Sequence, residues 1–270
     1  MDRFTRDGLT FSVADEGPSG GEAVVLLHGF PQDGASFAQV VPLLHASGLR
    51  TLVPVQRGYV PQARPRARRA YRTEETAADV LALLDAAGLA EAHLVGHDWG
   101  GAQAWAVSAW HPERVSTLTA LSTPHPAAMA GALVLGGQAL RSWYMGLFQL
   151  PAVPELLVGR TLAGSLMSTG LPAEHAERYA RAMAEPGALT GALNWYRGLP
   201  FSTRPPVGRV GVPTTFVWGR NDPFLGRTAA EATARYVTAP YRFVELDAGH
   251  WLPETRPEDV AEAVLARVGR

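Results

Sequence analysis

The chain has 270 residues, of which 47% are hydrophobic, and its formal net charge is −1 at pH 7. This length and composition predict one globular domain with room for an inserted segment, and they exclude a disordered chain. The balanced charge gives no attraction to nucleic acid or to an anionic membrane, so we expect neither as a partner. Cysteine and lysine are both absent, which excludes a thiol nucleophile, a disulfide, a Schiff base and the lysine of a P-loop.

The N-terminal residues 1–17 are polar and mixed in charge, unlike a secretory signal. No apolar run in the sequence approaches the roughly 20 residues that are needed to span a bilayer. We therefore expect a cytoplasmic protein.

Strands and helices are predicted to alternate along the first half of the chain. Two short strands flank the turn Asp7-Gly8, which is a hairpin signal. Apolar strands are expected at 23–27, 50–55, 92–95 and 115–121, and helices at 36–45, 73–88 and 99–110, with Thr73 as a helix cap. This alternation predicts an α/β protein with a mostly parallel sheet and helices on both faces.

The pattern changes after Pro124 and Pro126, where the chain becomes a series of helical pieces broken by glycine and proline. The alternation resumes with strands at 214–218 and 241–246 and helices at 228–236 and 257–268. We therefore predict a core made of residues 1–126 and 208–270, with residues 127–207 inserted as a helical cap. The arginine-rich stretch 64–72 is expected to be a solvated loop.

The segment Gly96-His97-Asp98-Trp99-Gly100-Gly101 lies between a predicted strand and a predicted helix. Small residues on both sides of a central nucleophile are typical of a nucleophile elbow, here with aspartate in the usual place of serine. Such a turn strains the central residue and leaves no room for a flanking Cβ atom. The helix N-terminus favours an ionised carboxylate. The alternative is that Asp98 only caps the following helix, because aspartate is a common N-cap.

Partners for Asp98 follow in the order that α/β-hydrolases use. Asp222 comes after the strand 214–218, and His250 comes after the strand 241–246. Both lie at the carboxyl ends of strands, where sites in open sheets form. We therefore predict a catalytic triad of Asp98, Asp222 and His250, and favour it over the capping role.

An oxyanion hole is predicted from the segment His28-Gly29-Phe30-Pro31, which follows the first buried strand. In that position the backbone N–H groups of Phe30 and Trp99 can donate to a developing oxyanion. The remaining histidines near the motifs are expected to have structural roles; these are His28, His97, His111 and His125.

An aspartate nucleophile indicates substitution at a saturated carbon. The carboxylate forms an ester, and water can then attack the carbonyl group that belongs to Asp98. Epoxides and alkyl halides both suit this chemistry, and an opening epoxide also needs a proton donor. The phenols of Tyr144 and Tyr196 in the cap can donate, although each alone could be a packed aromatic residue with its hydroxyl at the surface.

With these motifs in place, the sequence resembles the epoxide hydrolases of the α/β-hydrolase-fold superfamily over nearly its whole length. The segments that carry the resemblance are His28-Gly29-Phe30-Pro31, Arg57-Gly58-Tyr59, Gly96 to Gly101, Asp222-Pro223-Phe224, Gly249-His250-Trp251, Tyr144 ahead of Phe148-Gln149, and Asn194-Trp195-Tyr196-Arg197. The resemblance implies the α/β-hydrolase fold, a cis peptide before Pro31, and binding of the epoxide oxygen by Tyr144 and Tyr196. One departure is Val55-Gln56-Arg57, where the family often has an aspartate two residues before the arginine, and this leaves the partner of Arg57 open.

Substrate contacts are expected from Phe30, Trp99, Phe148 and Trp195, with Trp143, Leu147 and Leu150 as further residues that could line the pocket. The expected reaction converts an apolar epoxide and water to a vicinal diol, without a metal or an organic cofactor. The alternatives are a haloalkane dehalogenase with the same triad, a biosynthetic enzyme for one elaborate epoxide, and a non-catalytic binding protein on this fold. Phe30 favours the epoxide reaction, because many dehalogenases carry asparagine there. A homodimer is left open.

Overall fold

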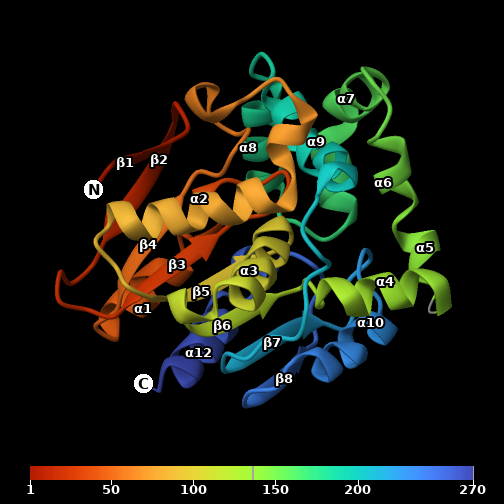
Figure 1. Ribbon diagram of the computed structural model, residues 1–270. Helices are drawn as coiled ribbons and strands as arrows, with labels where there is room; N and C mark the ends of the chain where they lie inside the picture. The colour runs from red at the N-terminus through yellow and green to blue at the C-terminus, as the bar shows by residue number, and fades with distance from the viewer. Residues whose placement is uncertain (136, 270) are drawn as a thin grey trace.

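The computed structural model describes residues 1–135 and 137–269. Within these residues, eight strands form one sheet in the order β1-β2-β4-β3-β5-β6-β7-β8 (Figure 1). The strands are β1 (Arg3–Arg6), β2 (Leu9–Glu16), β3 (Ala23–Leu27), β4 (Arg50–Pro54), β5 (Ala92–His97), β6 (Val115–Leu121), β7 (Thr214–Gly219) and β8 (Tyr241–Leu246). Only β2 with its two neighbours pairs antiparallel among these strands, so the predicted mostly parallel sheet is confirmed.

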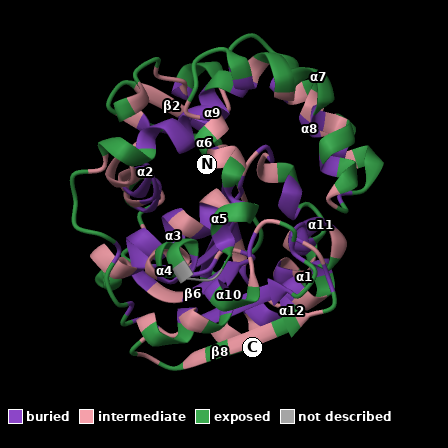
Figure 2. Cartoon of the chain, turned by 90° about the vertical axis from the view of Figure 1, so that its right-hand side faces the viewer, coloured by how far each residue is buried: buried purple, intermediate pink, exposed green. Residues whose placement is uncertain are grey.

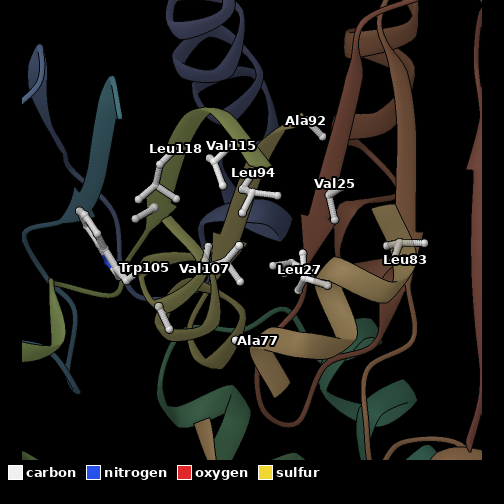
Figure 3. Packing of buried hydrophobic residues seen from close by; sticks show 14 of the residues in the cluster. Val25, Leu27, Ala77, Leu83, Ala92, Leu94, Trp105, Val107, Val115 and Leu118 are labelled. Atoms are coloured by element: carbon white, nitrogen blue, oxygen red, sulfur yellow. The ribbon is translucent and has the colours of Figure 1, made fainter. Parts of the chain in front are cut away.

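Helices cover both faces of the sheet. On one face lie α2 (Thr73–Ala86) and α3 (Trp99–Trp110), and on the other lie α1 (Val40–Ala46) and α12 (Pro257–Val268). The alternation of side chains along β3 separates the two layers, because Val25 and Leu27 pack against α2 and α3 whereas Val24 and Leu26 face α1 and α12. Figure 3 shows the first of these layers. Each such buried aliphatic side chain contributes about 1.5–3 kcal/mol.

A helical insertion separates β6 from β7. It contains α4 (Pro126–Leu135), α5 (Gln138–Arg141), α6 (Trp143–Leu147), α7 (Val153–Ser168), α8 (Ala173–Ala184), α9 (Ala188–Gly198) and the 3₁₀ turn η5 (Leu199–Phe201). In Figure 2, α9 is largely buried, whereas α7 and α8 expose their outer sides. The boundary at residue 127 stays a prediction, and α4 packs against α10 beside the sheet.

The shorter helices lie mainly in the connections. They are α10 (Arg227–Ala232) and α11 (Leu252–Thr255), with 3₁₀ turns η1 (Gly34–Phe37), η2 (Pro61–Ala63), η3 (Arg68–Tyr71), η4 (Pro112–Arg114) and η6 (Thr233–Tyr236). The helices predicted at 36–45 and 228–236 therefore each divide into a 3₁₀ turn and an α-helix. No helix in the described ranges combines the length and apolar character that crossing a membrane requires.

Thr73 is the first residue of α2 and not its cap, which corrects the prediction. Arg72 occupies the cap position with an extended backbone. The hydroxyl of Thr73 instead accepts a hydrogen bond from Ser202, whose oxygen also accepts the backbone N–H of Thr73. This contact comes from the end of the insertion, so local sequence could not reveal it.

The arginine-rich stretch 64–72 is solvated only in part, which corrects a second prediction: Arg66 and Arg69 are exposed, but the stretch includes the turn η3 and makes contacts with the rest of the chain. Arg64 donates to backbone oxygens of Gly58, Tyr59 and Pro186, and Tyr71 is buried. Since Pro186 belongs to the insertion, this stretch joins the sheet region to the helices that cover it.

Arg57 finds its partner on α2. Its guanidinium donates to both carboxylate oxygens of Asp79 at 2.6 and 2.7 Å, and both side chains are buried. Arg6 makes a further contact with Asp79 at 3.0 Å. Arg57 therefore has a buried carboxylate partner, although no aspartate stands two residues before it.

Candidate active site

Asp98 occupies a sharp turn between β5 and α3, with φ of 52° and ψ of −119°. Such a conformation is costly for a residue with a side chain, and the surrounding structure must hold it. The flanking glycines permit the turn: a Cβ atom on Gly96 would overlap the carbonyl of Gly100, and one on Gly100 would overlap the carbonyl of Leu27. The elbow that was predicted from the motif is therefore present, and close backbone contact maintains it.

Two backbone N–H groups act on the carboxylate of Asp98. Phe30 donates to Oδ1 at 2.7 Å, and the backbone N–H of Trp99, the next residue, helps to lower the pKa of this carboxylate. These are the same two groups that were predicted for an oxyanion hole, and the Phe30-Pro31 peptide is cis, as the resemblance implied. Burial raises the pKa of Asp98, while His250 and the two N–H groups act in the opposite direction.

His250 lies beside Asp98 and is oriented by Asp222. Its Nδ1 is 2.7 Å from Oδ2 of Asp222, and its Nε2 is 3.7 Å from Oδ2 of Asp98. Asp222 also accepts the backbone N–H groups of Phe224 and Leu225 at 2.7 and 3.0 Å. Burial alone would lower the pKa of His250, but the carboxylates of Asp222 and Asp98 outweigh it and raise the pKa above its ordinary value.

A network of buried hydrogen bonds holds the backbone of the loop that contains His250. The backbone oxygen of His250 accepts a hydrogen bond from the hydroxyl of Ser122 at 2.7 Å and lies 2.9 Å from Nε2 of His97. The other ring nitrogen of His97 is 2.8 Å from Oε1 of Gln32, which also accepts the backbone N–H of Gly29. His97 therefore links the histidine loop to the loop that contains Phe30.

The other histidines expected to be structural have partners away from the carboxylate of Asp98. His28 accepts the backbone N–H of Gln56 at 3.1 Å. His125 lies 2.9 Å from the backbone oxygen of Gly208. His111 faces Glu113 at 3.5 Å near the surface.

Two tyrosines of the insertion complete the site. Tyr144 on α6 and Tyr196 on α9 have ring centroids 6.1 Å apart, and Tyr196 also makes an edge contact with Trp99 at 4.8 Å. Burial, together with the nearby carboxylate of Asp98, raises the pKa of both phenols above its ordinary value. Both groups are therefore neutral hydrogen-bond donors near neutral pH.

A cavity of about 290 Å³ brings Asp98, Tyr144 and Tyr196 together. Trp99 and Trp195 also line it, as predicted. Phe30 and Phe148 are not among its lining residues and instead pack against Tyr196, with ring centroids 5.6 and 4.9 Å away.

Other cap residues lie differently from the expectation. Trp143 and Leu150 are 67% and 47% exposed on the surface of the insertion. Sequence reasoning missed much of the cavity wall, which is formed by Met129, Ala130, Leu133, Leu199, Val207 and Leu225 together with Tyr71, Thr73, Thr76, Ala102, Gln103, Thr123, Pro124, Pro126 and Met145. The helical spacing of Met129 and Leu133 was a usable signal, but it did not reveal what their shared face covers.

The described residues contain no group of three or more histidine, aspartate or glutamate side chains placed to hold a metal ion. The cavity instead holds the carboxylate of Asp98 and two phenols, and beside that carboxylate lie an imidazole with its own carboxylate and two backbone N–H groups. Such a set can perform nucleophilic attack, general acid-base transfer and oxyanion stabilisation.

Comparisons with known proteins agree with this geometry. Residues 22–257 match the family described as the alpha/beta hydrolase fold. The chain is 35% identical over 272 residues to the AB hydrolase superfamily protein YfhM of Bacillus subtilis, with 96% of this chain and 94% of that protein covered. It is 33% identical over 306 residues to epoxide hydrolase A of Mycobacterium tuberculosis, with the same shares covered.

Comparison with solved structures also finds epoxide hydrolases. The crystal structure of epoxide hydrolase A from Mycobacterium thermoresistibile has a TM-score of 0.85 at 26% identity, over 99% of this chain and 97% of that one. An epoxide hydrolase of Bacillus megaterium, at 22% identity, shares the fold with a TM-score of 0.87 over 99% of this chain and 100% of that one. The chain therefore belongs to the epoxide hydrolases of the α/β-hydrolase-fold superfamily.

Proposed function

We propose that this protein hydrolyses apolar epoxides to vicinal diols through a covalent ester on Asp98. The observation that carries the proposal is the carboxylate in the elbow, which shares one cavity with two neutral phenols and lies beside an oriented imidazole. The names of the relatives support the same reaction.

In the first half-reaction, the carboxylate of Asp98 attacks one ring carbon of the epoxide. The bond between that carbon and the ring oxygen breaks as the new ester bond forms. The phenols of Tyr144 and Tyr196 bind the ring oxygen, and one of them gives it a proton and becomes a phenolate. A carboxylate suits this step because the resulting ester, unlike an ether, can be cleaved by water.

In the second half-reaction, His250 takes a proton from water, and the hydroxide attacks the carbonyl carbon of the Asp98 ester. The tetrahedral oxyanion is stabilised by the N–H groups of Phe30 and Trp99. The bond to the alkyl oxygen then breaks, and this oxygen takes the proton from His250 to complete the diol. The proton that remains on Asp98 returns to the phenolate, so the free enzyme is restored.

The pair of phenols favours epoxides over alkyl halides as substrates. An opening epoxide produces an alkoxide, which needs a proton, whereas a departing halide needs only weak N–H donors in an apolar pocket. Two phenols that line the same cavity as Asp98, Tyr196 buried and Tyr144 partly buried, meet the first requirement.

The test is diol formation from styrene oxide by the wild type and by Asp98→Ala, with halide release from 1-bromobutane measured in parallel. Asp85→Ala is a matched control, because Asp85 pairs with Arg114 at the surface of α2 and is 68% exposed. We expect diol from the wild type and the control, and none from Asp98→Ala. Halide release without diol, or full diol formation by Asp98→Ala, would contradict the proposal.

A further inference from the structure

The cavity extends from Asp98 mainly to one side, along helix α3. Trp99, Ala102 and Gln103 line it from one face of α3, at the spacing of neighbours on a helix. Thr76 of α2 and Met129 of α4 also line it. The cavity thus extends from the carboxylate over the N-terminal half of α3, on the side of the sheet that α2 and α3 cover.

On the other side of Asp98 the space is filled by side chains. His250 packs between Phe224 and Trp251, with ring centroids 5.0 Å from each. The residues that flank this loop, Ala248 and Leu252, belong to the core layer beneath α1 and α12. None of these residues lines the cavity.

The part of the insertion that lies over this filled side is also aromatic. Phe148 is buried and contacts Phe30, Tyr144 and Tyr196, with ring centroids 5.9, 5.5 and 4.9 Å away. These rings continue into the buried cluster that includes Leu162 and Tyr179 of α7 and α8. A group that projected from Asp98 in this direction would meet a packed hydrophobic cluster.

The open side is apolar. Its wall includes the aliphatic side chains of Met129, Leu133, Leu199 and Val207, of which Leu133 and Leu199 are partly exposed to solvent. Apart from Asp98, no described residue of the wall carries a charged side chain. An uncharged alkyl or aryl group therefore suits this space, and burying it there is favourable at about 25 cal/mol per Å² of apolar surface.

Epoxides differ in the number of sides of the ring on which their substituents need space. A terminal epoxide has a bare CH₂ on one ring carbon, so its substituent extends to one side only. A trans-1,2-disubstituted epoxide has a substituent on each ring carbon, and these point to opposite sides of the ring. Resting on the epoxide hydrolysis proposed above, we propose that the substrates are terminal epoxides with one apolar substituent, which lies along α3 toward α4.

The first experiment compares two isomers of the same mass, 1,2-epoxyoctane and trans-4,5-epoxyoctane, by kcat/KM for diol formation. We expect the terminal isomer to be preferred by at least about 10- to 200-fold, which is the range for a single methylene that a hydrophobic pocket discriminates. Comparable kcat/KM for the two isomers would overturn the inference and leave epoxide hydrolysis intact. Absence of diol from every epoxide would refute the proposed function, and this inference with it.

A terminal ring carbon is also less hindered toward attack in general, so variants must separate the shape of the cavity from intrinsic reactivity. Ala102→Leu fills the open side beside Asp98. It should lower kcat/KM for 1,2-epoxyoctane by about 10-fold or more, and that for propylene oxide, which serves as an internal control, by much less. Equal losses for the two substrates would contradict the inference. If Ala102→Leu does not fold, Met129→Trp on α4 makes the same test from the opposite wall.

Discussion

The sheet and the helical insertion hold their parts of the site by different means. Asp98 is held by backbone packing, since Gly96 and Gly100 leave no room for a Cβ atom. Tyr144 and Tyr196 are held by aromatic contacts with Phe148 and with each other. Backbone contact tolerates no added atom, whereas packed side chains can rearrange at modest cost. The difference predicts a rigid nucleophile facing an adaptable pair of proton donors.

The buried ion pairs show the same contrast. In the sheet region, Arg57 and Asp79 are both removed from solvent. In the insertion, Arg197 is buried but its partner Glu155 is 22% exposed. Arg197 also donates to the backbone oxygen of Phe148, so this pair supports the aromatic cluster around the tyrosines.

The largest effect is expected from His250→Gln, which removes the base of the second half-reaction. Turnover should fall by up to about 10⁴-fold, while attack by Asp98 continues. The ester should therefore accumulate and raise the mass of the protein by that of one epoxide. Normal turnover, or an inactive variant that never gains this mass, would contradict the proposed division of labour.

The ion pairs provide the next comparison. Asp79→Ala should destabilise the fold by about 3–5 kcal/mol, because it leaves Arg57 buried without a partner. Glu155→Ala should cost less, about 1.5–3 kcal/mol for a hydrogen-bonded charge, and should slow diol formation through Phe148. Urea unfolding and kcat/KM of both variants test this. Equal stability losses would contradict the expected effect of the different burial of the two carboxylates.

Glycine substitutions test the backbone directly. Gly100→Ala should cost about 1–3 kcal/mol or more and displace Asp98, because the added Cβ atom overlaps the carbonyl of Leu27. Gly146→Ala on α6 is the matched control, since no atom lies within 4 Å of the added Cβ. The control should be neutral or stabilise by up to about 1 kcal/mol. Thermal unfolding and diol formation report both effects, and a fully active Gly100→Ala would refute the steric account of the elbow.

The smallest effect is expected from removing one phenol. Tyr144→Phe and Tyr196→Phe should each slow ester formation by about 10-fold, because the other phenol still donates, whereas the double variant should lose the full contribution of about 10²–10⁴. Stopped-flow tryptophan fluorescence can follow the ester in single turnovers. Tyr241→Phe, on β8 outside the cavity, is the control. A change in the rate of ester hydrolysis alone would mean that the phenols act in the second half-reaction, and would contradict the proposed role.

The elbow and its partners could be predicted because their signals are local. Gly96 and Gly100 constrain the turn through neighbouring residues, and the loops carrying Asp222 and His250 follow strands whose carboxyl ends meet at one edge of the sheet. The mostly parallel sheet was predicted for the same reason, since each strand showed its own apolar run.

The insertion was less predictable because its helices are short and contact distant parts of the chain. In α6, of five residues, no periodicity distinguishes exposed Trp143 from cavity-lining Tyr144. The bond from Arg64 to the backbone of Pro186 joins residues 122 positions apart. The composition of the stretch suggested that Arg64 faces solvent. Its hydrogen-bond partner in the insertion becomes visible only in the folded chain.

The most direct test of the covalent route is a single turnover in H₂¹⁸O with enzyme in excess over styrene oxide. Hydrolysis of an ester on Asp98 must place the oxygen of water in the carboxylate, so mass spectrometry of the peptide containing Asp98 should show one ¹⁸O, and the first diol should be unlabelled. Label in the diol with none in the peptide would mean that water attacks the epoxide directly, and would contradict the role of Asp98 as nucleophile.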